Sequence, residues 1–441
     1  MSRYKAYPAY QDSKVEWLGE APSHWACIPV GRLYRRTKRT NFPEKELLSV
    51  YRDHGVVPTS SRDDNNNKPS EDMTAYQLVE PDNLVMNKMK AWQGSIAISG
   101  YEGIVSPAYF VYEPNAKMFD LAIPKYIHYL LRHPIYVAQY LRQSKGIRVN
   151  QWDLDPDEFK KIELLLPAKE EQKKIINFLD HETAKIDALI EKQQRLIELL
   201  KEKRQAVISH AVTKGLNPNA PMKDSGVEWL GEVPAHWLVA GFKKYLSSSV
   251  DYRGKTPDKT ESGVFLVTAR NIKNGKINYE LAQEYIAEYD YSTVMSRGKP
   301  KIGDLLFTTE APLGEVAAVD REDIALAQRI IKFDFESETL SNRYMKYFIM
   351  SDQFQQSLMM FASGSTALGI KAERLVYLRT LAPSLDEQEA IVDHIESVSM
   401  AIDVLIEKAI TAIGLMQERR TALISAAVTG KIDVRNWQAA A

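Results

Sequence analysis

The chain has 441 residues, which is enough for two or three domains that each bury a core of their own. No apolar run approaches the roughly 18 residues of a membrane helix, and the near balance of 57 Lys and Arg against 58 Asp and Glu excludes a general polyanion binder. The start of the chain lacks a secretory signal and the single cysteine, Cys27, excludes a disulfide framework, so we expect a cytoplasmic protein.

The opening segment of the chain is repeated in the second half. Residues 12–25 read DSKVEWLGEAPSHW and residues 224–237 read DSGVEWLGEVPAHW, with 11 of 14 positions identical. Later matches lie 216 residues apart, and they are Glu-Gln at 171–172 and 387–388, LIEK at 189–192 and 405–408, and AVT at 211–213 and 427–429. The two halves therefore contain the same parts in the same order.

Between the repeated parts lie two segments with no comparable identity to each other. A shared frame with two divergent segments predicts similar halves that pack about a pseudo-twofold axis and present different surfaces. We expect an α+β fold class, with two mixed α/β domains joined by two long antiparallel coiled-coil helices. The predicted divisions are an opening segment (1–25), a first variable domain (26–168), a central region with a long helix and a linker (169–237), a second variable domain (238–384), a C-terminal long helix (385–432) and a tail (433–441).

Two long amphipathic helices are predicted, one from Glu170 to about Ala211 and one from Asp386 to about Val428. Their apolar residues recur at spacings of four and three, which is the heptad pattern of a coiled coil. At 1.5 Å per residue, about 38 residues form a rod of roughly 55–60 Å that could act as a stiff spacer. The alternative is a helical hairpin or a homodimer seam without a spacing role. The predicted seam residues are Ile175, Leu179, Ile186, Leu189, Leu196, Leu200, Ile391, Ile395, Ile402, Leu405 and Met416.

Over essentially its whole length the chain resembles the specificity subunits of type I restriction-modification enzymes. The matching motifs open each half (SKVEWLGEAPSHW and SGVEWLGEVPAHW), enter each long helix (LPAKEEQKKIINFLD and APSLDEQEAIVDHIE) and close it (AVTKGL and AVTGKID). The first variable domain adds LLSVYRDHGVV, NKMKAWQGSIAIS and EGIVSPAYFVYEP, and the second adds VTARNI, IGDLLFTTEAPLGEVA and FASGS. Together these motifs are highly specific, although any one of them alone is weak.

The resemblance implies that each variable domain is a target recognition domain that reads one half of a bipartite site in double-stranded DNA. The helices would separate the two domains and dock modification subunits, two of them by expectation, which bind S-adenosylmethionine and methylate adenine. Restriction subunits would join to translocate and cut DNA with ATP and Mg²⁺. The variable domains differ from member to member, so the resemblance does not transfer the recognised sequence.

DNA contacts need Arg, Lys, Asn and Gln side chains that reach base edges, and Lys, Arg and hydroxyl groups that reach phosphates. In the first variable domain the candidates are Arg35, Arg36, Lys88, Lys90, Gln93, Gln143, Lys145, Arg148 and Asn150. In the second they are Arg253, Lys255, Arg270, Asn271, Lys273, Ser363 and Ser365. A solvated face is the alternative for the basic run 32–39. Net charges of +2 (19 minus 17) for 26–168 and +1 (19 minus 18) for 238–384 predict weak DNA binding by this chain alone.

Motifs for catalysis are incomplete. The sequence GKT at 254–256 lacks the glycine five positions earlier that a phosphate-binding loop needs, because Ser249 is there. His24 and His236 have no acidic or cysteine partner at ligand spacing, so we expect them to pack or form hydrogen bonds beside the adjacent tryptophans. The sequence therefore favours a binding subunit with no catalytic, cofactor-binding or metal-binding residues of its own. The alternatives are an enzyme with a cryptic nuclease or methyltransferase site, and a coiled-coil scaffold for proteins only.

Overall fold

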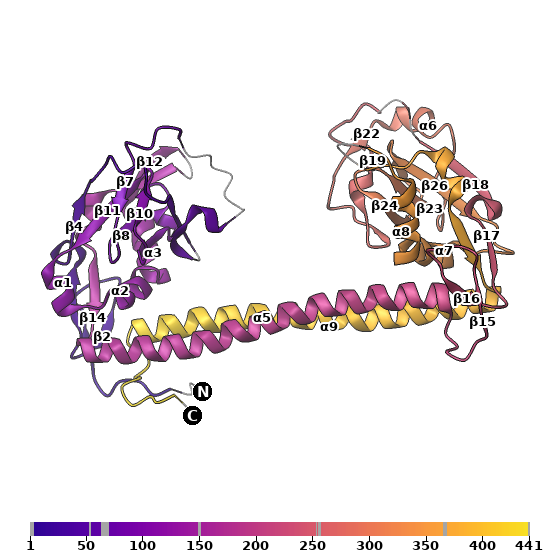
Figure 1. Cartoon of the computed structure of the whole chain (residues 1–441). Helices are drawn as coiled ribbons and strands as arrows, with labels where there is room; N and C mark the ends of the chain where they lie inside the picture. Colours follow the sequence, from indigo (N-terminus) through magenta and orange to yellow (C-terminus); the bar gives the residue numbers. More distant parts are fainter. Residues whose placement is uncertain are drawn as a thin grey trace. The chain divides into compact units, whose positions relative to one another are not determined.

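The structure is a computed structural model, and it describes residues 4–52, 54–62, 70–148, 151–252, 254, 257–364 and 368–439. The chain divides into two compact units (Figure 1). Unit 1 holds residues 1–192 and 411–441, and unit 2 holds residues 193–410. Each unit therefore contains one variable domain and a part of each long helix. The C-terminal tail belongs to the same unit as the N-terminal segment.

The centre of unit 1 is an antiparallel sheet with the strand order β4-β11-β8-β9. Its strands are β4 (Tyr34–Thr37), β11 (Tyr109–Pro114), β8 (Leu84–Asn87) and β9 (Ile96–Ile98). Both β8 and β9 are short apolar runs, and all their residues except Asn87 are buried, as expected for strands covered on both faces. Two-stranded ladders accompany this sheet, namely β1 (Tyr10–Asp12) with β2 (Glu20–Pro22), β3 (Ala26–Pro29) with β14 (Glu163–Leu166), β5 (Leu48–Tyr51) with β6 (Gly55–Pro58), β7 (Gln77–Val79) with β10 (Gly103–Val105), and β12 (Ser144–Arg148) with β13 (Gln151–Leu154).

The helices of unit 1 have clear start signals in the sequence. They are α1 (Ala116–Leu121), α2 (Pro124–Leu131), α3 (Pro134–Gln143) and α4 (Pro156–Phe159). Proline occupies the first position of α2, α3 and α4, where its missing N–H costs no hydrogen bond. His133 caps α3, because its Nδ1 accepts from the backbone N–H of Ile135 at 3.1 Å.

Unit 2 has the same sheet topology at its centre, with the strand order β18-β26-β23-β24. Its strands are β18 (Leu246–Asp251), β26 (Ile330–Phe335), β23 (Leu305–Thr309) and β24 (Leu313–Ala318). A three-stranded sheet of β22 (Tyr285–Ile286), β19 (Val264–Val267) and β25 (Ile324–Leu326) contains a parallel pair, β19 with β25. The other elements are β15 (Met222–Asp224), β16 (Glu232–Pro234), β17 (Leu238–Gly241), β27 (Arg379–Ala382), β20 (Ile272–Lys273), β21 (Lys276–Ile277), α6 (Tyr291–Val294), α7 (Asn342–Met350) and α8 (Asp352–Phe361).

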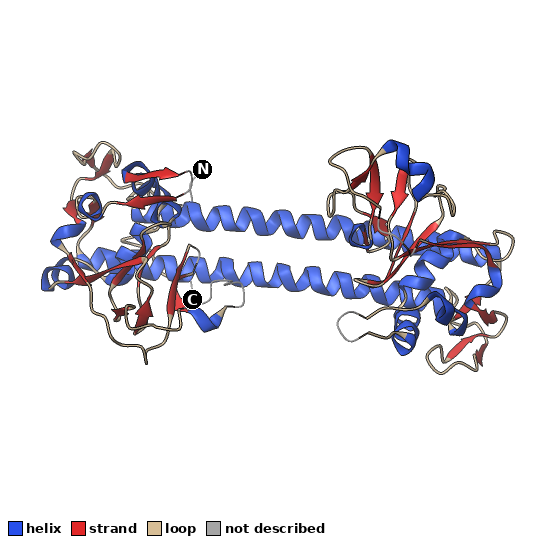
Figure 2. Cartoon of the chain, turned by 90° about the horizontal axis from the view of Figure 1, so that it is seen from above, coloured by secondary structure: helices blue, strands red, loops and turns tan. Residues whose placement is uncertain are grey.

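The two long helices are α5 (Lys169–Lys214) and α9 (Leu385–Val428), and they lie side by side in each unit (Figure 2). The contacts between them show that they run antiparallel. In unit 1 the Nε of Arg420 donates to Asp187 at 2.9 Å, and the ring of Trp437, beyond the end of α9, packs against Phe178 near the start of α5. In unit 2 Arg204 forms an ion pair with Asp403. Both ion pairs join a later part of one helix to an earlier part of the other.

Burial of the predicted seam residues changes along the helices. The buried ones are Ile175, Leu179, Ile186, Leu200, Ile391, Ile395 and Ile402. The prediction for Leu189, Leu196 and Leu405 is wrong, because their exposed fractions are 47%, 41% and 48%, and Met416 is half-buried. The start of each long helix is covered by the core of its unit, whereas further along one partner helix cannot cover an apolar stripe this wide.

The repeated Glu-Gln pair explains why the sequence motifs recur together. Gln172 is fully buried, and its amide donates to the carbonyls of Leu121 and Pro167, both at 2.8 Å, while its Oε1 accepts from the N–H of Ile123 at 2.9 Å. Gln388 does the same in unit 2. Each glutamine therefore ties its variable domain to the first turn of a long helix.

The glutamate of each pair binds the opening motif of its unit. Glu171 accepts hydrogen bonds from Tyr7 Oη at 2.6 Å and from Trp25 Nε1 at 3.1 Å, and it contacts His24 Nε2 at 2.8 Å. Glu387 binds His236 and Trp237 in the same way. The two histidines thus form hydrogen bonds as expected, but with a carboxylate 147 or 151 residues away.

Candidate nucleic-acid interface

The two central sheets carry different loops at the same point. In unit 1 residues 88–95 join β8 to β9, and in unit 2 residues 310–312 join β23 to β24. At the end of each loop the chain turns back toward the next strand at a glycine with a positive φ, Gly94 (+93°) in unit 1 and Gly314 (+86°) in unit 2. A Cβ at Gly94 would lie 3.4 Å from Val137 Cγ2 on α3, and one at Gly314 would lie 2.5 Å from Gln355 Oε1 on α8. Each loop is therefore folded back against the equivalent helix of its unit.

A second segment lies against each of these loops. In unit 1 the N–H of Leu154 on β13 donates to the carbonyl of Lys88 at 3.2 Å, and the rings of Trp92 and Trp152 lie 5.1 Å apart. We call residues 88–93 together with β12 and β13 loop pair 1. In unit 2 the N–H of Ile370 donates to the carbonyl of Thr309 at 2.9 Å, and Glu310 forms an isolated antiparallel β-bridge with Gly369. Residues 310–312 together with residues 363–364 and 368–370 form loop pair 2.

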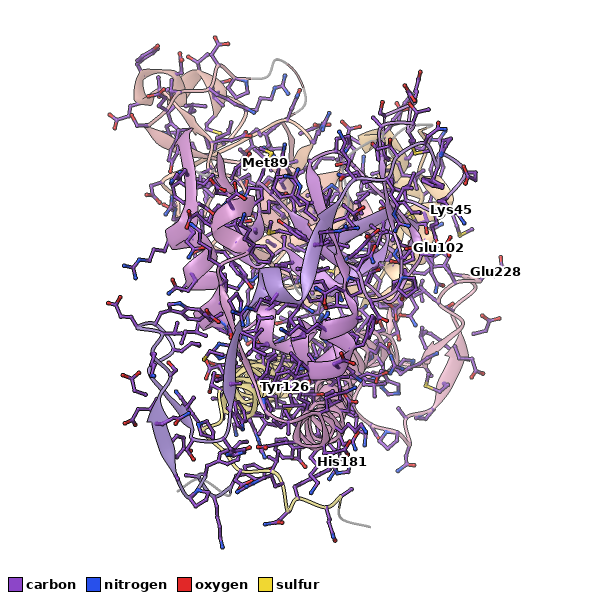
Figure 3. The ribbon with its side chains drawn as sticks, turned by 90° about the vertical axis from the view of Figure 1, so that its left-hand side faces the viewer. Lys45, Met89, Glu102, Tyr126, His181 and Glu228 are labelled. Carbon is purple, nitrogen blue, oxygen red and sulfur yellow. The ribbon has the colours of Figure 1, made fainter. Side chains whose placement is uncertain are left out.

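Loop pair 1 contains several of the predicted DNA contacts. Lys90 and Gln93 are exposed on the first loop, Lys88 is half-buried there, and Lys145 is exposed on β12. Gln143 ends α3, next to β12. The side chain of Arg148, on β12, and the whole of Asn150 lie outside the described residues. Figure 3 shows Met89, the exposed residue between the two lysines, above the level of Tyr126, which lies beside the ends of the long helices.

Arg35 and Arg36 are not part of loop pair 1. They lie on β4, at the opposite edge of the sheet from β9, and Arg36 is level with Leu84 rather than with the loop end of β8. Arg35 forms an ion pair with Glu113 at 3.7 Å, and the Arg36 guanidinium lies 4.1 Å from the centre of the Phe110 ring. The structure therefore separates these two arginines from the other candidates of unit 1.

A groove of about 820 Å³ adjoins loop pair 1 within unit 1. Trp92 and Gln93 line it together with residues of α2, α3 and α9, and its cationic residues are Arg52, Lys125, Arg132 and Arg420. Lys125 is paired with Asp180 at 2.7 Å, and Arg420 with Asp187 at 2.9 Å. Burial lowers the pKa of His128 and of His133, which also line the groove, to about 4. Both are therefore neutral near pH 7, and the arginines and the lysine supply the positive charge.

In unit 2 the structure rejects one candidate and keeps others exposed. The prediction for Asn271 is wrong, because its side chain is fully buried and binds backbone groups of its own loop. Arg270 and Lys259 share Glu284, with Lys259 Nζ at 2.8 Å from it. Lys273 is exposed on β20, and Ser363 is exposed in loop pair 2. Arg253, Lys255 and Ser365 lie outside the described residues.

Sequence reasoning missed the residues that follow β25. Gln328 and Arg329 line a cavity of about 370 Å³ with Lys259, Arg270 and Glu284. They meet there because β19 and β25 are parallel, so the segments after both strands lie at one edge. The available signal was a short apolar run followed by polar residues in each of 264–270 and 324–329. Only the strand pairing, which the sequence does not give, brings the two together.

Other kinds of site are not found in the part of the chain that the structure describes. No group of three or more His, Cys, Asp or Glu side chains there could hold a metal ion. Among the same residues no helix combines the length and apolarity that crossing a bilayer requires.

Two segments of the chain, residues 30–199 and 251–413, match the family model of the type I restriction modification DNA specificity domain. The chain is 27% identical over 359 residues to the type I restriction enzyme MjaVIII specificity subunit of Methanocaldococcus jannaschii, an alignment that covers 78% of this chain and 79% of the relative. It is 21% identical to the EcoKI specificity subunit of Escherichia coli K12, with 96% and 92% covered.

Solved structures have the same fold. The HsdS subunit from Thermoanaerobacter tengcongensis gives a TM-score of 0.50 at 13% identity, with 93% of this chain and 98% of that chain covered. A chain from a structure described as the basis of complex assembly and conformational transition of the type I R-M system gives 0.65 at 13% identity, with 92% and 98% covered. The chain belongs to the family of type I restriction-modification DNA specificity subunits. The predicted family, fold class and function are confirmed.

Proposed function

We propose that unit 1 and unit 2 each read one half of a bipartite DNA site, through loop pair 1 and loop pair 2. The observation that carries this proposal is the shared sheet with different loops at its equivalent end. A fixed backbone frame holds loops at a constant place, and exchanging their side chains changes which base edges are matched. The exposed cations and the exposed Gln93 amide of loop pair 1 suit major-groove readout, and the groove beside it, with its arginines, suits phosphate contacts.

The chain acts, in this proposal, as a non-catalytic cytoplasmic subunit. Modification subunits, two per specificity subunit, would dock on the long helices and supply S-adenosylmethionine, and restriction subunits would supply the ATP- and Mg²⁺-dependent steps. The small net charge of each variable domain supports this division of labour, because a partner must then supply much of the phosphate neutralisation. Incubating the purified chain alone with DNA, S-adenosylmethionine and Mg²⁺ tests it, and methyl transfer or cleavage would contradict it.

The direct test is exchange of a variable domain. The chain, co-expressed with its modification subunit, is expected to produce methylation at one asymmetric bipartite site, which methylome sequencing identifies. Replacing residues 238–384 with those of another family member should change one half of that site and leave the other half unchanged. Retention of both original halves after the exchange would contradict the assignment of unit 2 to a half-site.

A further inference from the structure

The edge where β19 and β25 end gathers several charged groups of unit 2. Arg270 follows β19, and Gln328 and Arg329 follow β25, so both segments line the cavity described above. Carboxyl ends of parallel strands are a common place for ligand contacts, because the chain leaves them in loops that face one crevice. Glu310, from loop pair 2, joins this group through its ion pair with Arg329.

Arg329 is held in an uncommon backbone conformation. Its φ is +77°, in the left-handed region that residues other than glycine rarely adopt. Its carbonyl accepts hydrogen bonds from both the N–H of Thr309, at 2.9 Å, and the Thr309 hydroxyl, at 3.2 Å. Its Nε lies 2.7 Å from Glu310 Oε1. The backbone and the side chain of Arg329 are thus both fixed to the start of the loop between β23 and β24, at Thr309 and Glu310.

The two carboxylates of this edge differ in accessibility. Glu284, which binds both Arg270 and Lys259, has only 14% of its side chain exposed. Arg329 and Glu310 keep 48% and 41% exposed. The cations are similarly accessible, since Arg270 and Lys259 keep 64% and 49% exposed, but of the two carboxylates only Glu310 is accessible to a duplex. Glu284 serves to hold its two cations, whereas Arg329 and Glu310 can both be reached together.

The presence of both positive and negative side chains at this edge favours a base pair over a phosphate as the ligand. Three cations (Lys259, Arg270 and Arg329) lie here with two carboxylates, Glu284 and Glu310. An accessible carboxylate repels a phosphate, but in the major groove it accepts a hydrogen bond from cytosine N4, while arginine donates two to guanine O6 and N7. A neighbouring Arg and Glu therefore match the two members of one guanine–cytosine pair.

We propose that Arg329 is a specificity-determining residue of unit 2 and that it reads the guanine of a guanine–cytosine pair, with Glu310 reading the cytosine. In the free chain Glu310 orients the guanidinium of Arg329, and in the complex with DNA both side chains form hydrogen bonds to base edges. This inference rests on the proposed function and adds to it a residue and a base pair. It requires the half-site assigned to unit 2 to contain a fixed guanine–cytosine pair.

The test compares Arg329→Ala and Arg329→Lys with the control Arg321→Ala, each in the chain co-expressed with its modification subunit. Arg321 is a matched control, because it is 44% exposed and ion-paired to Asp323 at 3.2 Å at the other end of β25. Methylome sequencing of Arg329→Ala is expected to show discrimination reduced about 10- to 100-fold at one base pair of the unit 2 half-site only. Arg329→Lys should recover little of this discrimination, because the lysine ammonium cannot donate the two parallel hydrogen bonds that a planar guanidinium donates. Arg321→Ala should keep the whole motif.

Two results would overturn the inference while leaving the proposed function intact. One is a full wild-type motif for Arg329→Ala, and the other is a uniform loss of methylation with an unchanged motif, which indicates a structural role. If Arg329→Ala yields no methylation at all, Glu310→Ala decides, because alanine removes the acceptor for cytosine N4. Relaxation at one guanine–cytosine pair supports the inference and an unchanged motif overturns it. A wild-type chain that specifies no bipartite site refutes the proposed function itself.

Discussion

The central sheets of the two units have the same strand order but different interiors. Asn83 in unit 1 and Asp304 in unit 2 close the turn before equivalent strands, and each accepts a hydrogen bond from the N–H three residues earlier, at 3.0 and 2.9 Å. Asp304 also binds Lys332 on β26 at 2.6 Å, with both side chains at most 7% exposed. Unit 1 has Val111 at the position of Lys332. The frame thus depends on the turn and the strand register, whereas the side chains inside it can change completely.

The largest effect is expected where the two units are alike. Ile186 and Ile402 occupy equivalent, buried positions 216 residues apart on the long helices. Ile186→Asp and Ile402→Asp should each destabilise their own unit by roughly 5 kcal/mol, because packing is lost and a carboxyl group is buried. Leu189→Asp and Leu405→Asp are the matched controls, and since both leucines are about half exposed we expect about 1 kcal/mol.

Hydrogen exchange read by mass spectrometry follows the two units separately in the same chain, so it measures both pairs of variants. Equal losses for the isoleucine and leucine variants would mean that the helices pack through a different face. A loss in only one unit would mean that the two ends of the helix pair are not equivalent.

A somewhat smaller effect is expected where the interiors differ. Lys332→Val leaves the Asp304 carboxylate buried without its partner and should destabilise unit 2 by about 4 kcal/mol. The double variant Lys332→Val with Asp304→Asn reproduces the residues of unit 1 and should recover most of that loss. The same exchange measurement, limited to β23 and β26, distinguishes the two. If the double variant is as unstable as the single one, the charge pair is needed for more than mutual neutralisation.

The smallest effect concerns pH and unit 1. Burial lowers the pKa of His128 and His133 to about 4 from an ordinary value of 6.5, so between these values the unfolded chain binds more protons than the folded unit. Stability of unit 1 should therefore rise with pH across this window, and acidification from pH 7 to pH 5 should cost on the order of 2 kcal/mol.

Unit 2 supplies the control for this pH dependence. The residue that caps α8 in unit 2 is Ser351, in the place that His133 takes before α3. His133→Ser should therefore reduce the pH dependence of unit 1 by about half, because His128 remains, while keeping a helix cap. Denaturant unfolding at several pH values measures the slope, and an unchanged slope in His133→Ser would exclude this histidine as its source.

The sequence predicted the repeat, the long helices and the two-domain plan because these depend on periodicity and on local identity. The role of Gln172 was out of reach, since its three hydrogen-bond partners are determined only once α1 and the start of α5 are packed. Asn271 was misjudged for a similar reason, as its burial follows from the loop that closes over it. Leu189 shows that a heptad pattern reports the direction of a side chain but not the number of neighbours that cover it.

Residues 411–439 complete the core of unit 1, where Val428 and Val434 are buried and Trp437 packs on Phe178. This unit is therefore made from two pieces of chain that are synthesised at different times, whereas unit 2 is one continuous piece. Since domains fold as they leave the ribosome, the long piece of unit 1 that is translated first must wait for the short piece that is translated last. Until then the hydrophobic surface around Phe178 stays exposed to solvent. A chain released before its C-terminal residues are translated therefore has an incomplete core in unit 1.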